Sequence, residues 1–260
     1  MKIGMINPRI SYYSGGGEKS MIDSILNVAG DSKDQFYVYT LKTPLAKTRI
    51  YKEFKKKAPK NVFIEELEIP KNYKEIYKIP PGEDRFRWDA ESLLLNSLIL
   101  PRLKIDGINL IWVNYILDAL VVPIEIPSIL NLLGYPRKES DYRDGLINQY
   151  TEIVPNARNV INKWNLLLKK KIVKFSLLYP GIDCTKEVKK KEIFRKDKFT
   201  IMFAGRFIER KGIKTLIEAT EILKKGGMEN IEVYLFGEGL FEPKIRKLIS
   251  SKGLGCFLSF

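Results

Sequence analysis

Apolar residues along this chain gather in short runs, which alternate with longer segments where they recur at helical spacing. Near the N-terminus, the apolar run 2–7 and the alternating run 35–41 predict two strands. Between them, residues 18–28 carry apolar side chains three and four positions apart, which predicts a helix. A strand, a glycine-rich loop, a helix and a second strand form the repeating unit of a parallel α/β sheet.

This alternation continues to residue 178 after one irregular region. Residues 42–84 contain Lys55-Lys56-Lys57 and several prolines, so we expect irregular structure with one strand near Val62–Ile64. Beyond it, the pattern predicts helices at 90–103, 116–122 and 157–171 and strands at 108–114, 128–133, 153–154 and 173–178. Strands that alternate with helices imply a parallel sheet with helices on both faces.

A charged segment separates a second round of the same pattern. We place a linker at 184–198, between an N-terminal domain, 1–183, and a partial C-terminal domain, 199–260. We expect an α/β fold class with two Rossmann-like domains, of which the second is incomplete. Two strands and the start of a third are too few to complete a doubly wound sheet. We expect that the chain is truncated or that a partner chain completes this sheet. The C-terminal pattern predicts strands at 199–204 and 231–236, helices at 213–225 and 241–252, and the start of a strand in 253–260.

Composition excludes several classes of chemistry. The chain has 260 residues, 45% of them hydrophobic, and no histidine, which excludes a Ser/His/Asp triad and a histidine-bound zinc. Its two cysteines make neither a disulfide framework nor a metal-ligand cluster, which fits a reducing cytoplasm. No secretory signal is visible, and the most apolar stretch, 93–100, is shorter than the about 20 residues that span a bilayer. We therefore expect a cytoplasmic protein without a bound metal.

The formal net charge of +14 favours anionic partners. Residues 153–182 contain no acidic side chain but carry Arg158 and five lysines. If 157–171 is helical, this basic surface is suited to an anionic membrane, and the alternative is a helix packed on the sheet with a solvated lysine face. Nucleic-acid binding is a second class of hypothesis, but no nucleic-acid motif is present and we expect no such partner.

A glycine loop, Gly15-Gly16-Gly17, lies between the first predicted strand and helix. Glycines let a backbone approach a ligand closely, and a helix N-terminus offers free N–H groups to a phosphate. The dinucleotide fingerprint would need a third glycine at Ser20, so a Rossmann dehydrogenase is disfavoured. A flexible loop without a ligand is the alternative.

Arg206 and Lys211 lie in a second loop, 205–212, between a buried strand and a helix. In a parallel sheet this loop falls at the carboxyl edge, where ligands bind. An arginine grips phosphate oxygens as a fork and a lysine acts as a point charge, so the pair suits a diphosphate leaving group. The alternative is a solvated basic turn. Gly237-Glu238-Gly239 follows the next strand, where a plain tight turn is the alternative to a ligand loop.

In this order the motifs resemble the glycosyltransferases of the two-Rossmann-domain (GT-B) architecture, most closely the retaining family called group 1 or family 4. The matching segments run Gly15–Glu18, Tyr179–Asp183, Phe203–Gly212, Phe236–Gly239 and Leu254–Gly255 with Phe260. The resemblance implies a nucleotide-diphosphate-sugar donor, transfer with retention, no dedicated metal or cofactor, and an acceptor that is lipid-linked or a polysaccharide.

The resemblance also implies roles for individual residues. Arg206 and Lys211 bind the donor diphosphate as the catalytic pair, and the glycine loops contribute to the donor site in the cleft between the domains: Gly15, Gly16, Gly17, Gly205, Gly237 and Gly239. Two departures stand out: the segment after 128–133 lacks the family's usual histidine, and the chain ends before the family's later glutamate pair. A non-catalytic remnant or subunit of such an enzyme is therefore the alternative.

Overall fold

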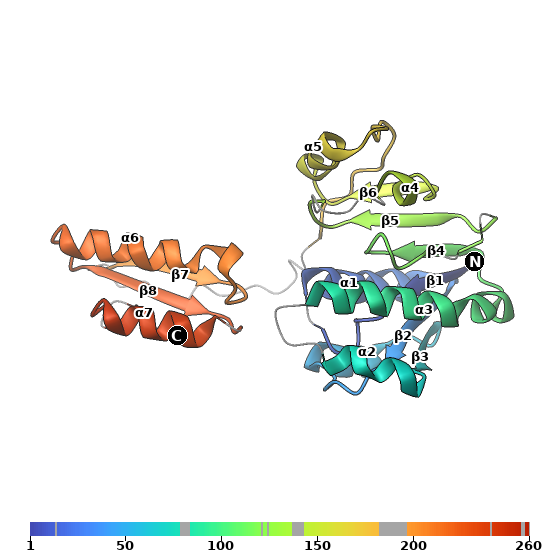
Figure 1. Cartoon of the computed structure of the whole chain (residues 1–260), viewed down its shortest axis with the longest axis horizontal. Helices are drawn as coiled ribbons and strands as arrows, with labels where there is room; N and C mark the ends of the chain where they lie inside the picture. Colours follow the sequence, from blue (N-terminus) through green and yellow to red (C-terminus); the bar gives the residue numbers. More distant parts are fainter. Residues whose placement is uncertain are drawn as a thin grey trace. The chain divides into compact units, whose positions relative to one another are not determined.

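The structure is a computed structural model that describes residues 1–13, 15–78, 84–120, 122–123, 125–136, 143–181, 197–239, 241–255 and 258–259. The chain divides into two compact units, Met1–Ile182 and Asp183–Phe260 (Figure 1). The predicted linker, 184–198, lies outside the described residues apart from Asp197 and Lys198. Each unit is an α/β structure built on a parallel sheet, which confirms the predicted fold class.

The first unit contains a six-stranded sheet in the order β3-β2-β1-β4-β5-β6, in which all neighbouring strands are parallel. The order reverses between β1 and β4, and in open α/β sheets ligands bind at such a point, outside the carboxyl ends of the strands. The strands are β1 (Lys2–Ile6), β2 (Gln35–Lys42), β3 (Val62–Glu68), β4 (Leu110–Val113), β5 (Ser128–Leu132) and β6 (Glu152–Pro155).

Helices cover both faces of this sheet, and each face has its own core. On one face Met21, Ile22 and Ile25 of α1 pack with Tyr51 and Phe54 of α2. On the other face, apolar residues of α3 and α5 share a larger core with β4 and β5. The helical segments are α1 (Gly16–Asp31), α2 (Arg49–Lys57), the 3₁₀ segment η1 (Lys71–Lys78), α3 (Asp84–Asp106), α4 (Arg143–Ile147) and α5 (Arg158–Leu167).

Helix α2 lies in the region that we predicted to be irregular, so that prediction is wrong there. Thr48 caps the helix by accepting a hydrogen bond from the backbone N–H of Tyr51 at 3.2 Å. Three lysines at its C-terminal end face the negative end of the helix dipole. Tyr51 and Phe54 are the only buried residues of α2, and most of its other residues are charged. Two buried positions are too few for apolar periodicity to reveal the helix.

Two further predictions near the sheet are wrong. Residues 116–120 form turns instead of a helix, and the backbone N–H of Asp118 donates to the carbonyl of Tyr115 at 2.9 Å. Residues 173–178 form no strand, although the N–H groups of Ser176 and Leu178 donate to carbonyls of β6. Helix α3 also runs past both predicted ends, through Pro101, and α5 ends four residues before the predicted 171.

The second unit contains a three-stranded parallel sheet in the order β7-β8-β9. Helices α6 and α7 share one core with Ile231, Val233 and Leu235 of β8. Strand β7 is mostly apolar, yet none of its residues is buried. The elements are β7 (Phe199–Ala204), the 3₁₀ segment η2 (Glu209–Lys211), α6 (Ile213–Lys225), β8 (Ile231–Phe236), α7 (Glu242–Ser251) and β9 (Leu258–Ser259).

Candidate functional site

The predicted cationic loop of the second unit, residues 205–212, is hydrogen-bonded to the Gly-x-Gly turn beside it, Gly237–Gly239. The loop follows β7, the turn follows β8, and both lie at the carboxyl edge of the sheet. The N–H of Gly205 donates to the carbonyl of Phe236 at 2.9 Å, and the N–H of Phe207 donates to the carbonyl of Glu238 at 2.8 Å. These hydrogen bonds extend the β7–β8 pairing past the strand ends and hold the two segments together.

Gly237 and Gly239 make this close approach possible. Their φ angles are +146° and +155°, which residues with side chains rarely adopt. A Cβ atom on Gly237 would lie 1.9 Å from the carbonyl oxygen of Gly205, and one on Gly239 would lie 2.6 Å from that of Phe207. The Gly-x-Gly turn is therefore part of the frame that positions the cationic loop. A Cβ on Gly205 would meet only ordinary contacts, at 3.5 Å.

Arg206 and Lys211 flank the anchor of this loop. Phe207 is fully buried and packs in the core of the unit. Arg206 beside it is half-buried, whereas Lys211 is exposed and ends η2. Gly212 follows with φ +73° and caps α6 without a side-chain hydrogen bond. A guanidinium, an ammonium and the first turn of a helix thus lie along one short segment, an arrangement suited to phosphate oxygens.

The first-unit glycines differ in the space beside them. Helix α1 begins at Gly16, and its N-cap, Gly15, has no side chain to cap it. A Cβ on Gly15 would lie 2.6 Å from the Glu18 carboxylate and from the Tyr13 ring. A Cβ on Gly16 would meet no atom within 4 Å, and one on Gly17 would lie 3.3 Å from Leu133. Gly16 is therefore the position of the three beside which a ligand has room.

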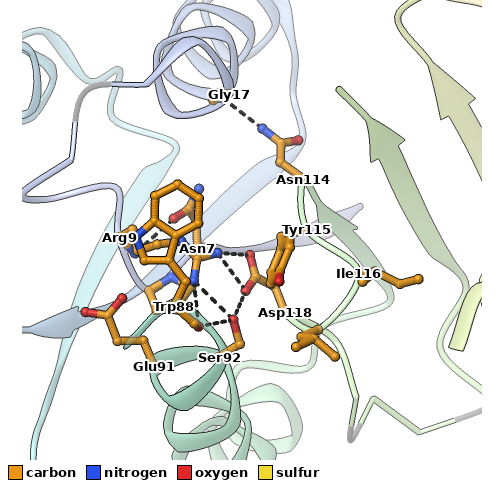
Figure 2. Close-up of polar contacts among 12 residues, drawn as sticks. Asn7, Arg9, Gly17, Trp88, Glu91, Ser92, Asn114, Tyr115, Ile116 and Asp118 are labelled. Carbon is orange, nitrogen blue, oxygen red and sulfur yellow. Dashed lines mark hydrogen bonds and ion pairs between the residues drawn. The ribbon is translucent and has the colours of Figure 1, made fainter. Parts of the chain in front are cut away.

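Asn114 connects this loop to the sheet, and sequence analysis missed it. It directly follows β4 and donates from Nδ2 to the carbonyl of Gly17 at 2.9 Å (Figure 2). Its Oδ1 accepts a hydrogen bond from Nδ2 of Asn131, in β5, at 3.1 Å. Polar residues placed immediately after buried strands, such as Asn7 and Asn114, were the signal available in the sequence.

A buried ion pair lies near the same edge. The guanidinium of Arg9 donates from Nη2 to both carboxylate oxygens of Asp118 at 3.0 Å, and the two side chains are 3% and 0% exposed. Arg9 also donates from Nη1 to Ser92 Oγ at 3.1 Å and lies 5.6 and 5.1 Å from the ring centroids of Trp88 and Tyr115 (Figure 2). This network joins the loop after β1 to α3 and the turns after β4.

Two other carboxyl groups near Arg9 have raised pKa values. Glu91 is fully buried, which raises its pKa from 4.5 to about 7, although the hydroxyl of Tyr12 donates to it at 2.7 Å. Burial also raises the pKa of Glu18, against the opposing effect of Arg9. Perturbed carboxyl groups at the switch point of a parallel sheet are typical of a functional region.

A cavity of about 600 Å³ lies elsewhere in the first unit. Its lining comes from α3 and from residues that precede β4 and β5, at the amino end of the sheet: Leu100, Pro101, Leu103, Lys104, Gly107, Ile108, Pro123 and Ile126. The glycine loop lies after β1, at the carboxyl end, so this cavity is separate from the candidate site.

The described part of the chain contains no cluster of three acidic or cysteine side chains able to hold a metal ion. In the same residues, no helix is both long enough and apolar enough to cross a membrane. The predicted site residues fall into two groups by unit. Gly15, Gly16 and Gly17 belong to the first unit, and the second holds Gly205, Arg206, Lys211, Gly237 and Gly239.

The sequence of the second unit matches a known family. Residues 185–258 match the family model of glycosyl transferases group 1, and this stretch contains the cationic loop and the Gly-x-Gly turn. No curated protein matches the sequence significantly. Over residues 185–258, this match confirms the resemblance to group 1 glycosyltransferases drawn from the sequence motifs.

Solved structures of glycosyltransferases share the fold. A mutant of TarM from S. aureus, in complex with fondaparinux, alpha-GlcNAc-glycerol and UDP, aligns with a TM-score of 0.68 at 12% identity over 99% of this chain and 76% of TarM. WaaG, a glycosyltransferase involved in lipopolysaccharide biosynthesis, aligns with a TM-score of 0.65 at 12% identity over 100% of this chain and 69% of WaaG. An E. coli structure described as trehalose-6-phosphate bound with UDP-2-fluoro glucose aligns with a TM-score of 0.62 at 15% identity, over 97% of this chain and 69% of the other. At these identities the likeness shows the GT-B fold.

Proposed function

We propose that this protein is a glycosyltransferase that transfers a sugar from a nucleotide-diphosphate-sugar to an acceptor, with Arg206 and Lys211 stabilising the departing diphosphate. One observation supports this most directly. The loop that carries both cations is hydrogen-bonded to the Gly237–Gly239 turn at the carboxyl edge of a parallel sheet, within the segment that matches group 1 glycosyl transferases.

The chemistry of the leaving group explains the choice of residues. Cleavage of the bond between the sugar and the diphosphate leaves negative charge on the diphosphate oxygens. Fixed positive charges stabilise that charge without reorganising during the reaction. The guanidinium of Arg206 offers a two-point contact, Lys211 a mobile charge, and the first turn of α6 its N–H groups. Because these groups supply the positive charge, we propose that the transfer needs neither a metal nor another cofactor.

The first unit has a second place for a phosphate or a hydroxyl group. Helix α1 presents its N-terminus beside Gly16, where the backbone has open space. We assign this loop to placement of the donor or of the acceptor. Burial raises the pKa of the neighbouring Glu18 carboxyl above its usual value.

We also propose the class of donor, the class of acceptor and the stereochemical outcome of the transfer. A uridine nucleotide is the first donor to test, because the TarM and E. coli structures hold UDP and UDP-2-fluoro glucose. A lipid-linked or polysaccharide acceptor is supported by the likeness to WaaG, which acts in lipopolysaccharide biosynthesis. Retention at the anomeric carbon rests on the family resemblance, and NMR of the product would contradict it if the anomeric configuration were inverted.

Titration with UDP and UDP-glucose, followed by calorimetry, tests the donor site. Arg206→Ala and Lys211→Ala should each weaken binding. Lys225→Ala removes an exposed lysine from the far end of α6, about 18 Å along the helix from its first residue, Ile213, and serves as the matched control. If the two site variants bind as tightly as the control, the assignment of Arg206 and Lys211 is wrong.

The basic segment after β6 supports a peripheral membrane role. Helix α5 packs on the sheet through Val160, Ile161 and Trp164, as in the structural alternative, but Leu166 and Val173 are 71% and 88% exposed. Lysines surround both positions, and no acidic residue occurs in 153–181. Apolar side chains among lysines suit the headgroup region of an anionic bilayer.

Vesicle flotation with and without acidic lipid tests this role. Leu166→Ser together with Val173→Ser should release the protein from acidic vesicles, whereas Ile222→Ser, which changes an exposed apolar residue of α6, should not. Equal binding to neutral and acidic vesicles would contradict the electrostatic part of the proposal.

The exposure of β7 supports a further partner in the second unit. Parallel strands rich in apolar residues are normally covered on both faces, yet Phe199 and Met202 are 66% and 68% exposed. We propose that a second copy of this chain, acting as the partner, covers this sheet. Light scattering coupled to size-exclusion chromatography should then show an assembly, and a monomer at high concentration would contradict this part of the proposal.

A further inference from the structure

The side chain of Asn114 spans the point where the strand order of the first sheet reverses. Asn114 directly follows β4, and β4 pairs with β1 on one side and β5 on the other. Its amide donates to the carbonyl of Gly17, in the first turn of α1 (Figure 2). The same amide accepts a hydrogen bond from Asn131 of β5. One half-buried side chain thus links β4 and β5 to the beginning of α1.

This hydrogen bond is additional to those that form the helix. In an α-helix the carbonyl of residue 17 accepts from the N–H of residue 21, and a carbonyl oxygen has a second lone pair for the amide of Asn114. Helix α1 also buries Met21, Ile22 and Ile25 in its own core. The contact is therefore not required to form α1, and its effect is to fix where the first turn points.

Asn131 determines the orientation of the Asn114 amide. Because Nδ2 of Asn131 donates to Oδ1 of Asn114, the opposite side of the amide, Nδ2, is directed to Gly17. Leu133 limits the space beside the loop, because a Cβ added to Gly17 would lie 3.3 Å from its side chain. The glycine loop is thus held by a hydrogen bond from the carboxyl end of β4, and a residue that follows β5 lies close to it.

We infer that Asn114 is a positioning residue that fixes the first turn of α1, and with it Gly16, for binding of the nucleoside diphosphate. This inference rests on the proposed function. Asn114 does not need to contact the ligand. It acts by holding the N–H groups of the α1 terminus in one direction, and a loose terminus loses affinity because binding must then order it.

Calorimetric titration with UDP and hydrogen exchange of the ligand-free protein test the inference together. Asn114→Ala should weaken UDP binding about fivefold, the value of one net hydrogen bond, and should speed exchange of the amides in residues 16–19. Asn114→Asp should weaken it further, because a carboxylate places negative charge beside the Gly17 carbonyl and the α1 terminus. Asn131→Ala should have a smaller effect in the same direction.

Asn61→Ala is the matched control, because Asn61 is half-buried and holds the other end of α1. Its Nδ2 lies 3.0 Å from the carbonyl of Ala29 and 3.1 Å from that of Ser32. This variant should lower the melting temperature at least as much as Asn114→Ala and leave UDP affinity within about twofold. If both variants lose affinity in proportion to their loss of stability, Asn114 is only structural and the inference is overturned.

The two readouts separate this inference from the proposed function. If the unmodified protein fails to bind UDP and other nucleoside diphosphates, the proposed function is wrong. Independently of that result, unchanged hydrogen exchange at residues 16–19 in Asn114→Ala would overturn the positioning role. If the unmodified protein binds UDP and Asn114→Ala binds it equally well, the proposed function stands and the inference is overturned. Weaker binding with faster exchange confined to 16–19 supports both.

Discussion

Arg9 and Asp118 form a two-point ion pair inside the first unit, with both carboxylate oxygens 3.0 Å from the same guanidinium nitrogen. The residues are 109 positions apart in sequence, so the pair joins the loop after β1 to the turns after β4. A buried charge is costly unless it is paired, and here Ser92 and the rings of Trp88 and Tyr115 complete the surroundings of the guanidinium.

Asp118→Ala should destabilise the first unit by about 3–5 kcal/mol, because it leaves the Arg9 guanidinium buried without an anion. The three tryptophans, Trp88, Trp112 and Trp164, all belong to this unit, so tryptophan fluorescence during urea unfolding reports its free energy of unfolding. The double variant Arg9→Met with Asp118→Leu removes both charges and should lose less than Asp118→Ala. A loss below 1 kcal/mol in Asp118→Ala would show that the pair is not needed to hold the two loops.

Glu91 should make the first unit less stable as the pH rises from about 4.5 to about 7. Burial raises the pKa of this carboxyl from 4.5 to about 7, against the opposing effects of Tyr12, Arg9, Arg87 and Tyr77. Over that window the folded state holds a proton that the unfolded state has lost, so linkage removes up to about 3 kcal/mol and the loss ends above pH 7. Urea unfolding at several pH values, followed by tryptophan fluorescence, measures this.

Glu91→Gln stays neutral at every pH and is the control for this dependence. Its stability should vary less between pH 4.5 and 7 than that of the unmodified protein. An identical pH profile for Glu91→Gln and the unmodified protein would contradict the assignment.

Glu66 acts in a different pH window, since its hydrogen bonds with Lys47, Lys55 and Tyr51 outweigh partial burial and lower its pKa to about 2. The stability that the ionised Glu66 carboxylate contributes is therefore lost as the pH falls below 4.5.

Gly237→Ala should disrupt the second unit, because a Cβ at this position would lie 1.9 Å from the Gly205 carbonyl oxygen at a φ of +146°. We expect a loss of more than about 1 kcal/mol, together with weaker UDP binding as the cationic loop shifts. Scanning calorimetry and UDP titration measure the two effects. Gly255→Ala is the control, since its φ is not positive and a Cβ there meets no atom within 4 Å. Equal behaviour of the two variants would show that the tie between loop and turn is unimportant.

The sequence predicted most of the second unit and less of the first. Helix α6 and strands β7 and β8 have the predicted bounds, because an amphipathic pattern and flanking glycines mark their ends. Helix α2 was missed because it buries only Tyr51 and Phe54. Residues 116–120 suggested a helix by their apolar content, but the buried Asp118 is satisfied by Arg9 in a turn.

The candidate site was predictable only in part for the same physical reason. A short loop that contains glycines and cations, such as Gly205 to Lys211, can be recognised from residue type and local spacing. The contact of Asn114 with Gly17 depends on strand order, since β4 lies beside β1 only because the sheet reverses there. A pattern along the chain carries no information about which distant strands are neighbours, so Arg9, Asn114 and Asp118 could not be connected from sequence.

Arg206→Lys separates the charge of Arg206 from its shape. A lysine keeps the positive charge but loses the planar fork that contacts two phosphate oxygens at once. If the fork is what the diphosphate site uses, Arg206→Lys should weaken UDP binding about tenfold, nearly as much as Arg206→Ala, and should leave UMP binding almost unchanged. Lys211→Arg should be tolerated, because Lys211 is exposed at the end of η2 and acts as a point charge. Titrations of UDP and UMP against the three variants measure this. Full affinity for UDP in Arg206→Lys would mean that only the net charge of the loop matters, and the two-point contact would have to be abandoned while the site itself remained.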